Sequence, residues 1–145
     1  MIKLFFAITL FLSPTLMPAA WMTNLDEAKQ VAKSEHKLIL LNFSGSDWCI
    51  PCMKLRADIF SSNNFMKYAK DNLILVNADF PRENKNQLSK QQQKMNDTLA
   101  AIYNPEGKFP FTILLDSNGN KLKVWDGYYS KGPENFVDEI TAVKE

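Results

Sequence analysis

Three runs of mainly apolar residues are the clearest pattern along the chain. They cover residues 38–41, 73–76 and 111–115, and the first run continues into Asn42-Phe43. Short runs that are apolar on both faces are typical of strands in a sheet that helices cover on both sides. The pattern therefore predicts strands at these three places in one covered sheet.

The segment before the first run carries the signals of a helix. Asn24 can cap its N-terminus, and Glu27, three residues later, fits a capping box. Its apolar residues share one face at helical spacing: Leu25, Ala28, Val31 and Ala32. We therefore expect an amphipathic helix that begins after Asn24.

Apolar residues at helical spacing predict four more helices, at residues 49–60, 63–71, 88–103 and 133–143. In the first of these, two sides are apolar, one formed by Met53, Ala57 and Phe60 and the other by Leu55 and Ile59. In the last two helices, the residues spaced for burial are Met95, Leu99, Ile102, Phe136, Ile140 and Val143.

A turn and a returning strand follow the third apolar run. Residues 116–120 read Asp-Ser-Asn-Gly-Asn, and Asn118-Gly119 suits the positive backbone dihedrals of a tight hairpin. Residues 121–128 would then return as an antiparallel strand. The order of the elements predicts an α/β fold with a central mixed β-sheet flanked by helices on both faces.

The N-terminus differs from the rest of the chain. Lys3 precedes an apolar stretch at residues 4–12, which small and polar residues follow. This arrangement is typical of a secretory signal peptide, and the apolar stretch is shorter than the ~20 residues that span a bilayer. We expect a signal peptide at residues 1–20 and a single domain at residues 21–145. The alternatives are a retained membrane anchor and a buried N-terminal helix.

Composition and charge bear on the class of protein and of partner. The chain is 46% hydrophobic and 23% charged, with a formal net charge of +1, which is ordinary for a globular domain. Its 17 basic residues are scattered along the sequence, so nothing indicates a nucleic-acid partner. We expect a monomer that is periplasmic or secreted, in a compartment where disulfides can form.

The two cysteines of the chain, Cys49 and Cys52, stand three positions apart. A structural zinc site needs about four ligands, and the chain adds only one histidine, His36, to the two thiols. A structural disulfide would close a very small loop and would stabilise the fold little. Redox chemistry is the favoured interpretation, while copper binding by the two thiolates stays open.

The position of the pair supports redox chemistry. It falls where a predicted strand ends and a helix begins, and the unpaired N–H groups of a first turn can stabilise a Cys49 thiolate. Cys52, almost one turn later, is placed to resolve a mixed disulfide. Pro51 fits the first turn, which does not need its missing N–H. Trp48 can shield the pair and offer partners an apolar surface, or it can pack in the core.

These features together resemble the thioredoxin superfamily, over roughly residues 38–131. The resemblance rests on Asn42-Phe43, Trp48-Cys49-Ile50-Pro51-Cys52, Asp79, Phe109-Pro110-Phe111-Thr112 and Gly127. The segments Phe-Ser-Gly-Ser-Asp-Trp-Cys and Asn-Ala-Asp-Phe-Pro-Arg also resemble secreted thioredoxin-like proteins of bacteria of the Bacteroidetes type. The resemblance implies a thioredoxin fold.

The resemblance also implies roles for individual residues. Cys49 and Cys52 would be catalytic, with Cys49 as the attacking and Cys52 as the resolving thiol. Substrate would be bound by Trp48, Pro51, Phe109 and Pro110, and the peptide bond before Pro110 would be cis. A proline at the start of a strand leaves the preceding backbone free to pair with an extended substrate segment.

Two polar residues near the pair depart from what this chemistry favours. Asn42 best matches the position of the buried aspartate that thioredoxins carry, and an amide cannot act as a general base. A carboxylate close to Cys49 would oppose thiolate formation. We therefore expect the side chain of Asp47 either to point to solvent or to cap the following helix.

The function implied by the resemblance is that of an exported thiol–disulfide oxidoreductase that reduces protein disulfides, with neither an organic cofactor nor a metal. Its partners would be proteins with disulfides or thiols, together with a membrane redox partner that donates electrons. The alternatives are a disulfide isomerase or oxidase, a non-catalytic thioredoxin-fold adaptor and a copper-binding chaperone.

Overall fold

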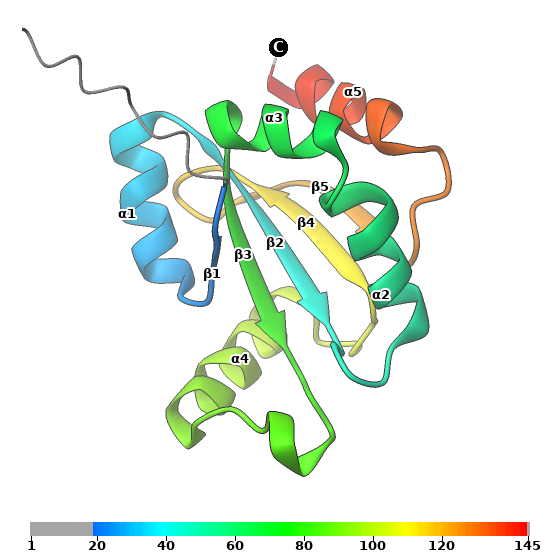
Figure 1. The fold of residues 1–145 in the computed structure, drawn as a ribbon. Helices are drawn as coiled ribbons and strands as arrows, with labels where there is room; N and C mark the ends of the chain where they lie inside the picture. The colour runs from blue at the N-terminus through cyan, green and yellow to red at the C-terminus, as the bar shows by residue number, and fades with distance from the viewer. Residues whose placement is uncertain (1–18, 145) are drawn as a thin grey trace, which may run out of the picture.

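A five-stranded sheet forms the centre of the computed structural model, which describes residues 19–144 (Figure 1). Most of the predicted signal peptide, residues 1–18, lies outside the described residues. The strands are β1 (Trp21–Met22), β2 (Leu38–Ser44), β3 (Leu73–Asp79), β4 (Phe111–Leu115) and β5 (Lys121–Asp126). Their order across the sheet is β1-β3-β2-β4-β5. β3 pairs in parallel with β1 and β2, whereas β4 is antiparallel to both β2 and β5, so the sheet is mixed as predicted.

The register of the sheet brings three strand ends to one edge. β2 and β3 pair from Leu38 with Leu73 to Ser44 with Asp79, so the two strands end level. β4 runs the opposite way, and its first residue, Phe111, pairs with Phe43 near the end of β2. The segments that follow β2 and β3 and the segment that precedes β4 therefore meet at this edge.

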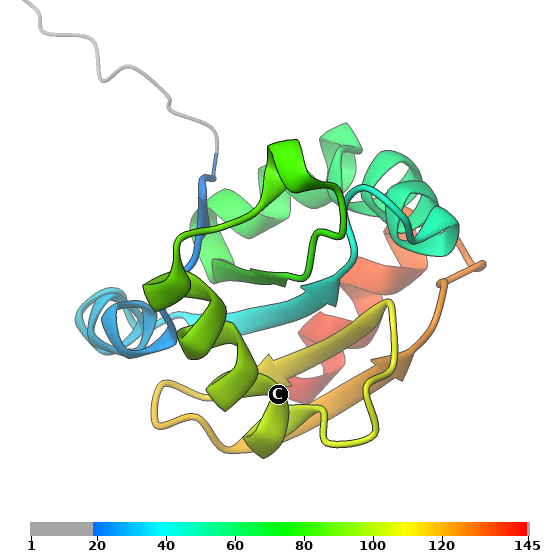
Figure 2. The same ribbon diagram turned by 90° about the horizontal axis from the view of Figure 1, so that it is seen from below.

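Helices cover both faces of the sheet, as the apolar strands require (Figure 2). One face packs against α1 (Leu25–Glu35) and α4 (Lys90–Tyr103), and the other against α2 (Ile50–Leu55), α3 (Asn63–Asn72) and α5 (Pro133–Lys144). Each face has its own apolar core, because successive side chains of the inner strands point to opposite sides. Among residues 19–144, no helix combines the length and the apolar character needed to cross a membrane.

The start of α1 confirms its predicted cap. The side chain of Asn24 accepts hydrogen bonds from the backbone N–H groups of Asp26, at 2.9 Å, and Glu27, at 3.3 Å. Leu25, Ala28 and Ala32 are buried, and Val31 packs at the margin of the same core. The predicted apolar face is therefore the face that meets the sheet.

The helix predicted at residues 49–60 differs from a regular α-helix. α2 ends at Leu55 and continues as a π-helical turn, η1 (Arg56–Phe60), in which the N–H of Ser61 donates to the carbonyl of Arg56. The wider turn shifts the buried side, since each π-helical bond spans one residue more than an α-helical bond. The buried residues are Cys52, Leu55, Ile59 and Phe60, whereas Met53 and Ala57, which were grouped with Phe60, are exposed.

Two other predictions need correction. Ile102 is 60% exposed, because α4 turns Asn96, Leu99 and Tyr103 toward the sheet. The hairpin is looser than a two-residue turn, because only Gly119 takes a positive φ, of 90°. The carboxylate of Asp116 holds this loop by accepting hydrogen bonds from the backbone N–H of Asn118, at 2.8 Å, and from the backbone and side-chain N–H groups of Asn120.

Three short features were absent from the sequence-based picture or differ from it. β1 is a strand of two residues that completes one edge of the sheet. A 3-10 turn, η2 (Asn84–Asn86), lies between β3 and α4. β5 ends at Asp126 and not at Tyr128, because Gly127, the next residue, turns the chain with a φ of 85°.

Candidate functional site

The two cysteines form a disulfide at the start of α2, where the sequence placed them. Their Cα atoms are 5.2 Å apart. Cys49 is the N-cap residue of α2, and its sulfur accepts a hydrogen bond from the backbone N–H of Cys52 at 3.3 Å. Pro51 occupies the first turn, where its missing N–H costs nothing. The helix start thus directs the N–H of Cys52 toward the sulfur of Cys49, an arrangement that favours a thiolate there.

The two cysteines are buried, whereas Ile50, which follows Cys49, is exposed to solvent. Cys49 is 4% and Cys52 6% exposed, whereas Ile50 is 70% exposed. Within residues 19–144, no group of three or more histidine, cysteine, aspartate or glutamate side chains is arranged to hold a metal ion. The chemistry offered by this arrangement is thiol–disulfide exchange.

Trp48 lies beside the pair and is neither fully in the core nor free on the surface. Its indole N–H donates to the carbonyl of Phe80 at 2.7 Å, and its ring meets the ring of Phe109 edge-on at 5.4 Å between centroids. The guanidinium of Arg82 lies over the indole, 3.7 Å from the ring centre. An open groove runs along these side chains, lined by Trp48, Phe80, Pro81, Arg82, Gly107 and Phe109.

Asp47 does not cap α2, and this part of the prediction is wrong. Its carboxylate accepts hydrogen bonds from the N–H groups of Arg82 and Glu83, each at 2.9 Å, and from the amide of Asn86 at 3.1 Å. The bond from Arg82 has the largest effect in lowering the pKa of Asp47, against a smaller opposing effect of burial. The carboxylate of Asp47 therefore binds the segment that follows β3 and not the first turn of α2.

The segment before β4 carries the second part of the site. The Phe109–Pro110 peptide bond is cis, which confirms the prediction. The carbonyl of Pro110 accepts a hydrogen bond from the N–H of Gly127 at 2.9 Å. Asn104, only 2% exposed, holds the approach to this segment by bonding both the N–H and the carbonyl of Lys108. Because β4 is antiparallel to β2, Pro110 lies at the same edge of the sheet as the cysteines.

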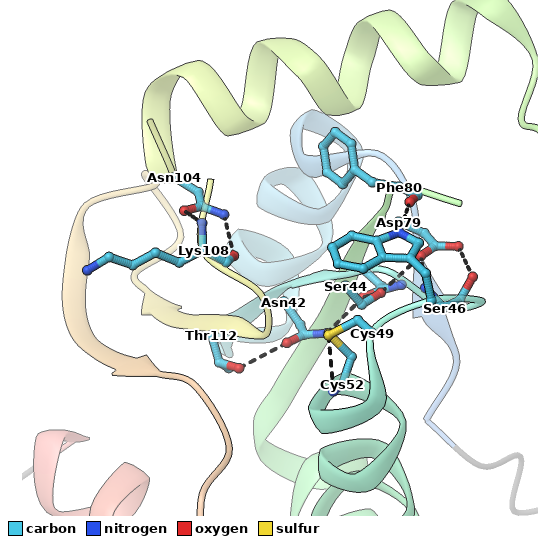
Figure 3. The surroundings of a disulfide bond; sticks show 12 residues. Asn42, Ser44, Ser46, Cys49, Cys52, Asp79, Phe80, Asn104, Lys108 and Thr112 are labelled. Atoms are coloured by element: carbon cyan, nitrogen blue, oxygen red, sulfur yellow. Dashed lines mark hydrogen bonds between the residues drawn. A yellow bond between two sulfur atoms is a disulfide. The ribbon is translucent and has the colours of Figure 1, made fainter. Parts of the chain in front are cut away.

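A chain of polar side chains runs across the sheet beneath the disulfide (Figure 3). The hydroxyl of Thr112 donates to the amide oxygen of Asn42, and the amide NH₂ of Asn42 donates to Asn77, both at 2.9 Å. Ser44 follows, with its hydroxyl 3.2 Å from the oxygens of both Asn77 and Asp79. The chain thus leads from Asn42 in β2 to a carboxylate at the end of β3.

Asp79 is the anchor at the end of this chain. One of its oxygens accepts from the backbone N–H of Ser46 at 2.9 Å, and the other from the Ser46 hydroxyl at 2.5 Å. Its backbone carbonyl accepts from the amide of Asn96 at 2.9 Å, and Asn96 is 2% exposed. Asp79 and Cys52 both line one cavity of about 580 Å³.

The structure therefore brings together most of the residues that the sequence singled out. Trp48 and Phe109 are in contact, and the cysteines, Pro51 and Pro110 lie at the same edge of the sheet. Sequence reasoning missed the polar chain through Ser44 and Asn77. Polar residues at the ends of two apolar runs were the available signal, but their pairing depends on the register of β2 with β3.

Comparison with known proteins supports this architecture. Residues 20–117, more than half of the chain, match the family model described as thioredoxin-like. Two curated relatives come from Chlamydia pneumoniae. Disulfide bond reductase DsbH is 38% identical over 114 residues, covering 79% of this chain and 66% of that protein. Thioredoxin-related protein DsbJ is 30% identical over 125 residues, covering 86% of this chain and 35% of that protein. The chain thus spans less than two thirds of the length of either relative.

A solved structure gives the same answer for the fold. The structure titled DsbH Oxidoreductase superposes with a TM-score of 0.79 at 28% identity, covering 94% of this chain and 92% of that one. The finer resemblance to proteins of the Bacteroidetes type stays a prediction. The chain belongs to the thioredoxin-like family and has the thioredoxin fold.

Proposed function

We propose that this protein is an exported thiol–disulfide oxidoreductase that reduces disulfides in other proteins. The observation that carries the proposal is the Cys49–Cys52 disulfide at the first turn of α2, within a thioredoxin-like domain. The direction of electron flow follows the relative with 38% identity, whose name is disulfide bond reductase.

The reaction uses the reduced pair. The thiolate of Cys49 attacks one sulfur of a substrate disulfide, whose S–S bond breaks and releases the first substrate thiol. Cys52 then attacks the sulfur of Cys49 in the mixed disulfide, so that the Cys49–Cys52 bond forms and the second substrate thiol leaves. Two electrons pass to the substrate. The cysteine pair loses two protons, and the two released substrate thiols gain two.

The substrate site extends from the pair to the segment before β4. Trp48, Pro51, Phe109 and Pro110 line the exposed side of this edge in the proposal. Supporting it, Trp48 and Phe109 form one continuous aromatic surface, and the groove beside them is open. An extended substrate segment laid along Phe109-Pro110 would bring its disulfide to Cys49, in the manner of strand addition.

A reductase that acts outside the cytosol needs a source of electrons there. The signal peptide at residues 1–20 would deliver the domain to the periplasm or outside the cell, and the domain would act there as a monomer. Each turnover leaves the pair oxidised, so a membrane redox partner must return two electrons. No organic cofactor or metal enters the exchange, because the electrons move within sulfur–sulfur bonds.

Reduction of insulin by dithiothreitol tests the proposal. The domain at residues 21–145 should accelerate the precipitation of insulin, and Cys49→Ser should abolish the acceleration. Cys52→Ser is the matched control, because it keeps the attacking thiol and should trap a mixed disulfide that mass spectrometry detects. Full activity of Cys49→Ser would contradict the assignment. Tight stoichiometric Cu(I) binding without turnover would favour a copper chaperone instead.

A separate measurement tests export. N-terminal sequencing of the protein recovered outside the cytosol should give a start near Trp21. A start at Met1 would contradict cleavage of a signal peptide.

A further inference from the structure

The second step of the exchange leaves one proton without an assigned acceptor. Cys52 must lose its thiol proton to attack the sulfur of Cys49, because the thiolate is the nucleophile in disulfide exchange. Cys52 is only 6% exposed, so contact with bulk water is limited. We propose that Asp79, at the end of β3, accepts this proton through the cavity that it shares with Cys52. The proposal rests on the function proposed above.

The cavity provides the path. Its volume of about 580 Å³ is ample for water, and its wall is polar on the side of the sheet, where Asn42, Ser44, Asn77 and Asp79 lie. A water molecule in such a site needs two to four polar partners, and these side chains supply them. Proton transfer from Cys52 to Asp79 can therefore pass through water held between them.

Asn42, the other candidate by position, is excluded by chemistry and by its contacts. An amide has no basic site at neutral pH. Its oxygen already accepts from Thr112, and its NH₂ already donates to Asn77, both at 2.9 Å. Asn42 is therefore a fixed part of the cavity wall, and the carboxylate of Asp79 is the base that lines the same space.

The hydroxyl groups around Asp79 can change their hydrogen-bond direction. The single hydroxyl proton of Ser44 has two acceptors at 3.2 Å, the oxygens of Asn77 and Asp79. It can donate to Asp79 when the carboxylate is ionised and to Asn77 when the carboxyl group is protonated. A proton on the other oxygen of Asp79 can be donated to the hydroxyl oxygen of Ser46, which is exposed and free to turn its own proton to water, while the N–H of Ser46 continues to donate to the first oxygen.

Two other charged residues lie close to this path. Arg56, on η1, is the one charged side chain besides Asp79 among the residues that line this cavity. Asp47 follows β2 in the same loop as Ser46, but its carboxylate is bonded to Arg82, Glu83 and Asn86. Asp79 is therefore the carboxylate available to Cys52.

The step balances in atoms and charge. The proton of Cys52 passes to Asp79, the Cys52 thiolate bonds to the sulfur of Cys49, and the bond from Cys49 to the substrate sulfur breaks. The departing substrate thiolate then takes up a proton, which Asp79 can return through the same water. The two electrons of the broken bond leave with the substrate sulfur.

The test separates the two steps of the exchange. Reduced protein is mixed with excess oxidised glutathione, quenched in acid at intervals, and analysed by mass spectrometry for the glutathione adduct and the internal disulfide. In Asp79→Asn, formation of the adduct should stay within about twofold of the unmodified protein. Its conversion to the internal disulfide should slow by at least tenfold at pH 7, since general base catalysis typically contributes ~10²–10⁴-fold.

The pH profile distinguishes a lost base from a disturbed structure. An ordinary thiol ionises near pH ~8.5, so conversion in Asp79→Asn should recover as the pH approaches 9, whereas a structural defect would persist. Asp79→Glu keeps the carboxylate and should retain most of the conversion rate, even if Asp79→Asn fails to fold. Asp97→Asn is the matched control, because it neutralises an exposed carboxylate on α4 outside the cavity, and it should change neither step.

Three results would overturn the proposal. Asp79→Asn could convert the adduct at the unmodified rate across the pH range, or it could slow adduct formation and conversion equally. Loss of conversion in Asp79→Glu equal to that in Asp79→Asn would also contradict it. If the unmodified protein forms no glutathione adduct, the function proposed above fails, and this inference fails with it.

Discussion

At the scale of single residues, the segment before the cysteines is fixed by contacts that lead away from the sulfur atoms. The indole of Trp48 donates to the carbonyl of Phe80, and Asp47 accepts from the two residues that follow Pro81. Gly45 makes this packing possible, because a Cβ there would lie 2.5 Å from Nε1 of Trp48 and closer still to its Cε2. Glycine is required here by close approach and not by a positive φ.

Gly45→Ala should therefore displace the indole of Trp48. We expect a loss of about 1–3 kcal/mol in the free energy of unfolding, which is typical of overpacking a buried site. The near-ultraviolet circular dichroism of the tryptophans should change, and insulin reduction should fall if Trp48 binds substrate. Urea unfolding and the insulin assay measure these effects.

The same substitution in a Trp48→Ala background is the control. Without the indole, Gly45→Ala should cost less than about 0.5 kcal/mol, because the clash is gone and the two sites are coupled through it. An equal cost in both backgrounds would show that the backbone, and not Trp48, excludes a side chain at position 45.

At the scale of elements, α5 is tied to the sheet by one carboxylate. Glu139 accepts hydrogen bonds from the indole of Trp125 at 2.9 Å and the hydroxyl of Tyr129 at 2.8 Å, and it pairs with Lys123 and Lys131 at 3.3 Å. Partial burial raises the pKa of Glu139, but these four partners together lower it to about 2. The ionised form therefore stabilises the docking of α5.

The pH dependence of unfolding should show this contribution. A carboxyl group whose pKa falls on folding stabilises the native state above its unfolded pKa, and this stability is lost as the pH falls through the folded value. For Glu139 the loss should occur between about pH 4.5 and pH 2. Glu139→Gln should lower the free energy of unfolding by about 2 kcal/mol at pH 7, as for a hydrogen-bonded charge, and remove this part of the acid sensitivity.

Asp138→Asn, an exposed position on the same helix, is the control for Glu139→Gln. We expect it to change the free energy of unfolding by less than about 0.5 kcal/mol. Urea titrations at pH 7, 5 and 3 would measure both variants. A loss in Glu139→Gln that is the same at pH 3 as at pH 7 would argue against the ionised clamp.

At the scale of the whole molecule, the N-terminal strand completes the second core. Trp21 pairs with Leu75 in the sheet, and its ring lies 5.1 Å from that of Phe60 between centroids. Met22 pairs with Val76 and packs against the first core. Two residues thus connect the start of the domain to both faces, at a position one residue beyond the expected signal peptide.

A chain that begins at Trp21 should be more stable than a chain that begins at Thr23. Loss of Trp21 and Met22 removes two half-buried side chains, which we expect to cost about 2 kcal/mol in the free energy of unfolding. Both chains keep the cap at Asn24, so α1 is unaffected. Thermal and urea unfolding compare them directly, and equal stability would show that β1 contributes nothing to the fold.

The sequence by itself determined the elements and the chemistry of the pair. Uninterrupted apolar runs fixed the inner strands, because such strands are stable only when both faces are covered. The position of Pro51 between Cys49 and Cys52 indicated the start of a helix. The first turn of a helix tolerates proline because its N–H groups have no partner within the helix, and this is a purely local property. The cap at Asn24 was readable for the same reason.

The tertiary structure decided what depends on register and on packing between distant segments. The π-turn in η1 placed Phe60 on the buried side with Leu55, whereas Met53 and Ala57, whose spacing with Phe60 suited burial, are exposed. Asp47 was drawn to the segment after β3, which lies beside it only because β2 and β3 end level. The same register set Ser44 beside Asp79 and placed a carboxylate on the cavity of Cys52. No local pattern encodes these pairings, because the sheet brings together residues that lie some 35 positions apart in the chain.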